Sequence, residues 1–263
     1  MPTPTKSDRP TQVETRAGRI AWVTGAGSGI GRALALRLAS DGWNVAVSAR
    51  TLQDLETLAA ELPDRIHPCP LDVTDADAVL SAVAHIEHRL GPIDLAVLNA
   101  GTYRRDAADQ FEVAAFRATV DVNLMGSVHC LAALLPRMLE RRAGHVAVVA
   151  SVVGYVGLPG AVAYGATKAA LINMCEALYP QLAARNVRLS VVNPGFVDTL
   201  LTQKNDFPMP FLISTEEAVD HIIAGLKSRR FEIAFPWKMV LSLKLLALLP
   251  APLLFALTRR MLR

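Results

Sequence analysis

Short apolar runs alternate with longer stretches of helical period through most of this chain. A short apolar run predicts a buried strand, and a longer stretch with apolar residues every three or four positions predicts a helix. The predicted strands are Ile20–Val23, Val45–Ser48, Ile66–Leu71, Ile93–Leu98, His145–Ala150 and Val187–Val192, with a further strand-like run at Phe231–Phe235. The predicted helices are Gly29–Ser40, Leu52–Leu62, Ala76–Leu90, Phe111–Leu139 and Tyr164–Ala183.

The order and the apolar character of these elements predict the fold class. Strands that are apolar along their whole length are covered on both faces, and the helices between them supply the crossovers that parallel strands need. Two helix starts agree with this division, because Thr51 precedes Leu52 and Thr74-Asp75 precedes an Ala-rich helix. We expect an α/β fold with a doubly wound, mostly parallel sheet.

Length and composition favour a single domain. A chain of 263 residues, 52% of them hydrophobic, can bury one large α/β core. We expect a loose polar tail over residues 1–17, one folded domain over 18–235, and an apolar, basic extension over 236–263. The tail lacks the apolar segment of a secretory signal, so a cytoplasmic protein is expected.

Charge and cysteine content argue against several classes of partner. The net charge of +3 is too small to favour nucleic acid. Cys69, Cys130 and Cys175 are widely spaced and form no CxxC pair, and six scattered histidines add no metal-binding pattern. We therefore expect no disulfide and no metal site, with the cysteines serving as small buried apolar residues.

The C-terminal extension combines apolar and basic residues. Residues 226–263 carry eight Lys or Arg side chains against Glu232 alone, and Met239–Leu257 is nearly all apolar but is interrupted by Lys244 and two prolines. A membrane-spanning helix needs ~20 apolar residues and a central lysine costs ~3 kcal/mol, so two short helices are expected instead. Three interpretations stay open: peripheral contact with an anionic membrane through residues 237–263, a subunit interface, or a lid over a functional site.

The first predicted strand runs directly into a glycine-rich turn that opens the first helix. The turn reads Thr24-Gly25-Ala26-Gly27-Ser28-Gly29-Ile30-Gly31. Small residues allow the backbone to approach a pyrophosphate, and the free N–H groups at the helix N-terminus attract it. Alone such a turn is a weak indication, but between a strand and a helix at the start of the domain it predicts nucleotide binding.

The end of the second predicted strand indicates which dinucleotide is bound. A dinucleotide-binding fold reads the adenosine ribose there, and an acidic side chain would accept a hydrogen bond from a free 2′-hydroxyl. This chain has Ala49 followed by Arg50, whose guanidinium pairs with a 2′-phosphate. NADP(H) is therefore expected in preference to NAD(H), the alternative being that Arg50 is an ordinary solvated charge.

Tyr164 and Lys168 lie four residues apart in a predicted helix, which places them on one face. An ammonium beside a phenol stabilises the phenolate and would lower the tyrosine pKa toward the range useful for proton transfer. The spacing also suits a tyrosine that is half in the core with a lysine reaching past it to solvent. Other motifs are needed to decide.

Those motifs follow in order along the chain: Asn99-Ala100-Gly101 after the fourth predicted strand, Ser151 thirteen residues before Tyr164, and Pro194-Gly195 after the sixth strand. Together with the glycine-rich turn and the tyrosine and lysine pair, they make the chain resemble the short-chain dehydrogenase/reductase family over about residues 18–235. The resemblance is specific, because five separated motifs have the family's order and spacing. It implies a Rossmann fold and a nicotinamide cofactor.

The resemblance implies a role for each motif residue. The implied catalytic residues are Ser151, Tyr164, Lys168 and Asn123. The implied cofactor-binding residues are Thr24, Gly25, Gly27, Ser28, Gly29, Ile30, Gly31, Arg50, Asp72, Val73, Asn99, Ala100, Gly101, Tyr164, Lys168, Pro194, Gly195, Val197 and Thr199. Four of these residues keep a structural alternative. Asp72 would equally well cap the following helix, Asn99 and, with less weight, Asn123 would serve a structural hydrogen-bond network, and Ser151 would merely end its strand.

The resemblance also implies a reaction, in which a hydride moves between nicotinamide and a carbonyl or secondary alcohol while Tyr164 gives or takes a proton. Ser151 would bond the reacting oxygen, Lys168 would lower the tyrosine pKa and bind the nicotinamide ribose, and Asn123 would hold a water. Carbonyl reduction by a homodimer or homotetramer is expected. The alternatives are a non-catalytic NADP(H)-binding regulator and a membrane-interface scaffold, neither of which needs the proton-transfer residues.

Residues 199–215 occupy the place of the family's variable substrate lid. Phe207, Met209, Phe211 and Leu212 within it imply an apolar pocket wall, and hence a small hydrophobic carbonyl or alcohol substrate. The alternative is that these side chains only pack the lid onto the body of the protein.

Overall fold

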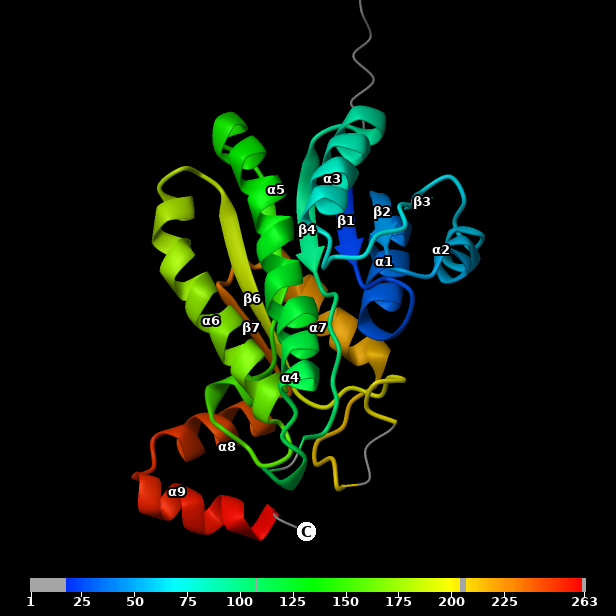
Figure 1. The fold of residues 1–263 in the computed structure, drawn as a ribbon. Coiled ribbons are helices and arrows are strands. Elements are labelled where there is room, and N and C mark those ends of the chain that lie inside the picture. Colours follow the sequence, from blue (N-terminus) through cyan, green and yellow to red (C-terminus); the bar gives the residue numbers. More distant parts are fainter. Residues whose placement is uncertain (1–17, 107, 204–206, 262–263) are drawn as a thin grey trace, which may run out of the picture.

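Figure 1 shows the protein as a computed structural model, which describes residues 18–106, 108–203 and 207–261. The tail expected over residues 1–17 lies outside the described residues.

Seven parallel strands form one sheet in the order β3-β2-β1-β4-β5-β6-β7. They are β1 (Ile20–Thr24), β2 (Asn44–Ser48), β3 (Ile66–Pro68), β4 (Ile93–Leu98), β5 (His145–Val149), β6 (Arg188–Pro194) and β7 (Glu232–Phe235). The strand order reverses between β1 and β4, and the carboxyl ends of all strands meet at one edge. The predicted doubly wound α/β fold is confirmed.

Helices cover both faces of this sheet (Figure 1). The first face packs against α3 (Ala76–Leu90), α5 (Gly126–Arg141) and α6 (Val162–Ala183), and the second against α1 (Gly29–Ser40), α2 (Leu52–Ala59) and α7 (Thr215–Lys227). Strand β1 shows why both are needed. Ile20 and Trp22 belong to the first core and Ala21 and Val23 to the second, because successive side chains point to opposite faces.

The long predicted helix Phe111–Leu139 is interrupted. Helix α4 spans Val113–Val120, a π-helical turn spans Asp121–Met125, and α5 follows. The continuous stretch from Val113 to Arg141 is long and apolar enough to cross a membrane, but here it packs against α3 and α6 in the core. The π turn carries Asn123, and the contacts of its amide, described below, explain the interruption.

Helix α7 is missing from the sequence prediction, although its start has a recognisable pattern. The Ser214 hydroxyl accepts a hydrogen bond from the backbone N–H of Glu217 (3.1 Å), and Glu216 and Glu217 lie in the first turn. This is the serine and glutamate spacing of an N-terminal capping box. The helix packs against α1 on the second face of the sheet.

The C-terminal extension forms two short helices, as predicted. They are α8 (Trp237–Ala247) and α9 (Ala251–Thr258), followed by the 3-10 turn η4 (Arg259–Met261). Helix α8 packs on η3 (Val152–Tyr155), the 3-10 turn that follows β5. The extension therefore lies beside the carboxyl-end edge of the sheet, where Figure 1 shows it below the strands.

Candidate active site

The glycine-rich turn is packed too tightly for larger residues. Gly25 has φ +66°, and a Cβ on Gly31 would overlap the Gly25 carbonyl oxygen and lie 2.5 Å from Asn99 Nδ2. That Asn99 amide donates to the carbonyl oxygens of Thr24 (3.1 Å) and Gly25 (3.2 Å). Asn99 thus has the structural role considered for it, because it ties the end of β4 to the turn.

The N-terminus of α1 suits an anion. Ser28 precedes the helix, but its side chain makes no capping hydrogen bond, and the first turn holds no acidic residue. The first backbone N–H groups of α1 are thus left for a ligand, and the positive end of the helix dipole favours a negative one. The pyrophosphate of a dinucleotide fits this donor set.

The residues expected around the adenosine lie at the ends of β2 and β3. Arg50 is exposed and close enough to Asp72 to lower its pKa, although the larger cause is a hydrogen bond from the Thr74 backbone N–H (3.0 Å). Helix α3 is capped by Asp75, which accepts from the backbone N–H of Ala78. The alternative that Asp72 caps α3 is therefore wrong. An adenine contact by Asp72 and Val73 stays a prediction.

The loop after β6 reaches across to the glycine-rich turn. Gly195 donates its backbone N–H to the Phe235 carbonyl (2.7 Å), and Val197 forms an isolated parallel bridge with Ile213. A Cβ on Gly29 would lie 3.1 Å from the Thr199 methyl group. The loop and the N-terminus of α1 are thus neighbours, as a cofactor bound between them would require.

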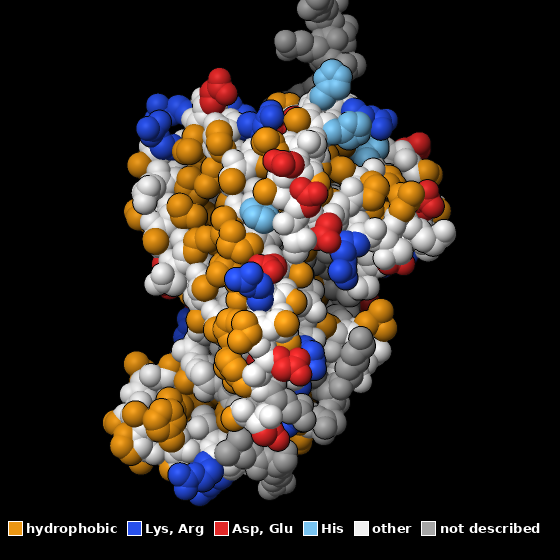
Figure 2. Space-filling view, viewed as in Figure 1, with side chains coloured by type: hydrophobic (Ala, Val, Ile, Leu, Met, Phe, Trp, Pro, Cys, Tyr) orange, Lys and Arg blue, Asp and Glu red, His pale blue; other side chains and the backbone are white. Residues whose placement is uncertain are grey.

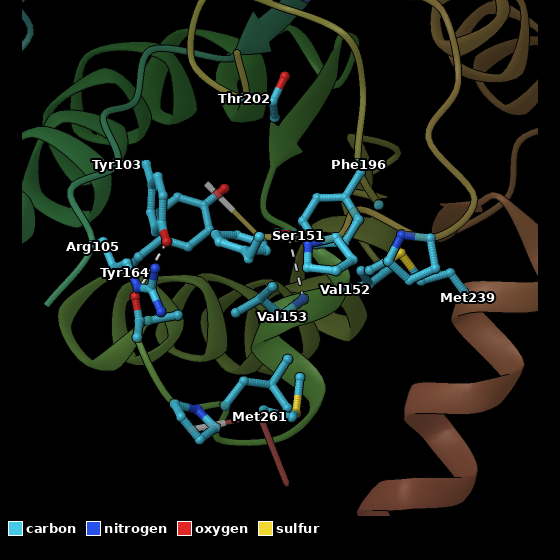
Figure 3. Close-up of a pocket in the computed structure, with 18 of the residues that line it drawn as sticks. Tyr103, Arg105, Ser151, Val152, Val153, Tyr164, Phe196, Thr202, Met239 and Met261 are labelled. Atoms are coloured by element: carbon cyan, nitrogen blue, oxygen red, sulfur yellow. Dashed lines mark hydrogen bonds between the residues drawn. The ribbon is translucent and has the colours of Figure 1, made fainter. Parts of the chain in front are cut away.

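Ser151 and Tyr164 line the same cavity of about 710 Å³. Ser151 follows β5, is buried, and donates its hydroxyl to the Pro194 carbonyl (3.2 Å) while accepting from the Val153 backbone N–H (3.3 Å). Tyr164 comes from the first turn of α6, and its ring packs edge-on against Tyr103 with centroids 5.1 Å apart. Figure 3 shows Tyr103 and Tyr164 together on one side of the cavity, with Ser151 near its centre.

Lys168 and Asn123 lie behind this pair. Lys168 is buried, and its Nζ donates to the Val149 carbonyl (2.9 Å) and lies 5.5 Å from the centroid of the Tyr164 ring. A Cβ on Gly101 would lie 3.4 Å from Asn123 Oδ1 and 3.8 Å from Lys168 Nζ, so Asn123 and Lys168 approach the same point. The four expected catalytic side chains are therefore gathered in one place.

The side-chain amide of Asn123 forms hydrogen bonds with other residues of the protein. Its Oδ1 accepts from the Thr102 backbone N–H (2.7 Å), and its Nδ2 donates to the Thr102 carbonyl (2.9 Å) and to Thr167 Oγ1 (3.2 Å). These contacts hold the π turn against the segment after β4 and against α6. Asn123 therefore braces the site, and a water held by Asn123 stays a prediction.

The pKa of Tyr164 is raised, whereas the sequence predicts that Lys168 lowers it. Burial raises the pKa of Tyr164 to about 12; the Ser151 hydroxyl opposes this shift and nearby Tyr103 adds to it. Burial also lowers the pKa of Lys168 from 10.5 to about 8. The expected lowering of the tyrosine pKa by Lys168 is not found, because the ammonium is bonded to Val149 and burial disfavours the phenolate. At neutral pH Tyr164 carries its proton.

The lowered pKa of Lys168 predicts a pH-dependent stability. Between pH 8 and 10.5 the unfolded chain binds more protons at this lysine than the folded one, so the free energy of unfolding rises with pH. Relative to Lys168→Met, the wild type should gain about 2 kcal/mol from pH 8 to pH 10, measured by urea unfolding. The raised pKa of Tyr164 acts in the opposite direction above pH 10 and is common to both proteins. A difference that is constant with pH would contradict the shift.

The rest of the cavity wall is mostly apolar and comes from distant segments. Phe207 lines it as expected, but Met209, Phe211 and Leu212 do not; Phe211 and Leu212 expose 45% and 43% of their surface. The pocket-wall interpretation is therefore right for Phe207 alone. Lys204, Asn205 and Asp206, in the same segment, lie outside the described residues.

Sequence reasoning missed several wall residues. They include Tyr103, Arg105, Phe196, Met239, Arg260 and Met261. Figure 3 shows Phe196 and Met239 on the side opposite the tyrosines, with Met261 near the bottom of the view. Met239 and Met261 belong to the C-terminal extension, so the lid interpretation agrees with its position. No local motif marks these residues, because they meet only in the folded chain.

Known proteins resemble this one in sequence and structure. The family profile described as short chain dehydrogenase matches residues 19–208. An uncharacterized oxidoreductase of Myxococcus xanthus (strain DK1622) is 39% identical over 246 residues, which is 92% of this chain and 97% of the relative. A short-chain dehydrogenase structure from Streptomyces avermitilis has a TM-score of 0.81 at 26% identity, covering 94% of this chain and 98% of that one.

A second solved structure, a short-chain dehydrogenase from Sphingobium yanoikuyae in complex with NADPH, has a TM-score of 0.76 at 26% identity and covers 83% of this chain and 88% of that one. The chain belongs to the short-chain dehydrogenase/reductase family, of the classical type. It is an NAD(P)-dependent oxidoreductase.

Proposed function

We propose that the protein is a carbonyl reductase that prefers NADP(H) and acts on hydrophobic ketones or aldehydes, with Tyr164 as the proton donor. The observation that carries this proposal is the pairing of Ser151 and Tyr164 in one largely apolar cavity, with Lys168 buried behind the tyrosine. The pair provides one hydroxyl to bond a substrate oxygen and a second to protonate it.

The protonation state of Tyr164 favours reduction over oxidation. When bound, the nicotinamide cofactor supplies the hydride. Tyr164 holds its proton at neutral pH because its pKa is raised, and a protonated phenol is the form that gives a proton to a carbonyl oxygen. Ser151 stabilises charge on that oxygen by turning its hydroxyl from Pro194 to the substrate. Lys168 supplies a positive charge or a proton behind the tyrosine.

The cavity favours a hydrophobic substrate of modest size. A volume of about 710 Å³ lies in the usual range for small-molecule sites. Phe196, Phe207, Leu158 and Met239 supply apolar surface around the two hydroxyls. Oxidation of NADPH with a panel of hydrophobic ketones and aldehydes tests this proposal directly. Turnover only of small, highly polar carbonyl compounds would contradict it.

The preference for NADP(H) is proposed from Arg50. The side chain is exposed beside the end of β2, next to Asp72, and no acidic residue stands at the position after Ser48. A guanidinium at this point is free to pair with a 2′-phosphate. Solved relatives bind either NAD or NADPH, so the proposed preference rests on Arg50 itself.

Replacing Arg50 by Ala is expected to lower the ratio of kcat/KM for NADPH over NADH by about tenfold or more, because a charge-assisted pair to the phosphate is lost. Steady-state kinetics with both cofactors measure this ratio. Arg185→Ala, which removes an exposed arginine after α6, is the matched control and should leave the ratio unchanged. An unchanged ratio in Arg50→Ala would defeat the cofactor proposal.

A further inference from the structure

The outer side of the C-terminal extension exposes a large group of apolar side chains. This surface, the C-terminal apolar face, is made up of Trp237, Leu241, Leu245, Leu248, Leu253, Phe255 and Leu257. Leu248 exposes 80% and Trp237 68% of its surface. Figure 2 shows hydrophobic side chains gathered over α8 and α9, with Lys and Arg at the lower end. Apolar surface of this extent marks an interaction site.

The inner side of α8 is firmly packed against the body of the protein. Met239 and Leu243 are buried against Val152 of η3. Lys244 is bonded to Glu232 of β7, whose carboxylate also accepts from the Tyr155 hydroxyl. The lysine that interrupts the apolar sequence is therefore paired with a residue of the sheet, although its side chain stays exposed. Because α8 is held by this network, its exposed side is a displayed surface rather than an unpacked helix.

The charges around the C-terminal apolar face are of one sign. Residues 237–263 contain no Asp or Glu. Lys238 lies at one end of the face, 5.8 Å from the ring centroid of Trp237, and Arg259 and Arg260 lie in η4 at the other end. In a two-fold contact between copies of this face, the arginines and lysines would meet without an acidic partner from either extension. A surface rich in negative charge complements them better.

We propose that the C-terminal apolar face docks on an anionic lipid bilayer. The leucines and Phe255 insert at the boundary between headgroups and acyl chains, Trp237 lies at the headgroup level, and the basic residues bind lipid phosphates. The helices are too short to span, at 11 and 8 residues, so the contact is peripheral. Arg260 and Met261 also line the cavity, so docking brings the cavity next to the membrane.

Vesicle flotation with the full chain tests the proposal. The wild type should bind vesicles of phosphatidylglycerol and phosphatidylcholine, bind pure phosphatidylcholine more weakly, and dissociate as salt is raised. Leu248→Glu should lower the partition coefficient at least tenfold, because a charge replaces an inserted apolar side chain. Lys238→Gln and Arg259→Gln should each lower it about fivefold on anionic vesicles.

A matched variant and a second measurement separate the alternatives. Leu80→Glu places the same charge at an exposed leucine of α3 and should leave binding unchanged. The thermal midpoint of each variant checks that it is folded. The proposal is overturned if the wild type does not bind anionic vesicles or if Leu248→Glu binds as well as Leu80→Glu. It is also overturned if light scattering shows that Leu248→Glu only dissociates an oligomer, because the face would then join two copies.

Discussion

Tyr164→Phe is expected to lower kcat for reduction of any accepted ketone by about a thousandfold while leaving NADPH affinity nearly unchanged. The phenol lines the cavity beside Ser151, and its raised pKa keeps the proton available. Phenylalanine preserves the edge-on contact with Tyr103 and removes only the hydroxyl. The measurements are kcat under saturating NADPH and the Kd for NADPH from fluorescence titration.

The same helix supplies a control for this variant. Tyr179 lies near the other end of α6, outside the cavity, with its ring against Phe231. Tyr179→Phe should retain wild-type turnover, because its ring packing survives the loss of the hydroxyl. If Tyr164→Phe kept most of its activity, or if it lost NADPH binding in proportion to turnover, the phenol would not be the proton donor.

The fold was predictable because its determinants are local. Strands such as β1 and β4 are apolar apart from Thr24 and Asp94, and this composition indicates cover on both faces. The π turn at Asp121–Met125 was not predictable, because it depends on the Asn123 amide finding the Thr102 backbone 21 residues away. Helix α7 differs from the π turn, because its capping pattern at Ser214 is local and can be read in the sequence.

The candidate active site likewise has features that the sequence predicts and features that it does not. The motifs that bring Ser151, Tyr164 and Lys168 together stand at strand ends and one helix face, positions that the sequence pattern locates. The pKa of Tyr164 was not predictable, because it depends on the burial of the phenol. It also depends on the hydrogen bond that Lys168 donates to the Val149 carbonyl instead of to the tyrosine. Met239 joins the cavity only because α8 folds back onto η3. Local spacing thus locates the chemistry, and tertiary packing sets its environment.

Gly31→Ala is expected to lower the thermal midpoint by about 5 °C and to weaken NADPH binding at least tenfold. Two effects oppose each other here. Alanine is the better helix former, by ~1 kcal/mol, which alone would stabilise α1. The added Cβ, however, would overlap the Gly25 carbonyl oxygen and crowd Asn99 Nδ2, and neither group can move without disturbing the turn. Overpacking of this kind costs ~1–3 kcal/mol, so the steric effect prevails.

Gly165→Ala separates the two effects. Gly165 stands in the first turns of α6, as Gly31 does in α1, but a Cβ there makes only ordinary contacts with Val153, to Cγ1 at 3.5 Å and to the carbonyl oxygen at 3.8 Å. Helix propensity should then dominate, and the thermal midpoint should stay level or rise. A rise in Gly31→Ala as well, with normal NADPH affinity, would show that the turn tolerates a side chain. Helix α1 begins at this turn. That outcome would therefore also show that close packing of the turn is not what positions the pyrophosphate-binding N–H groups of α1.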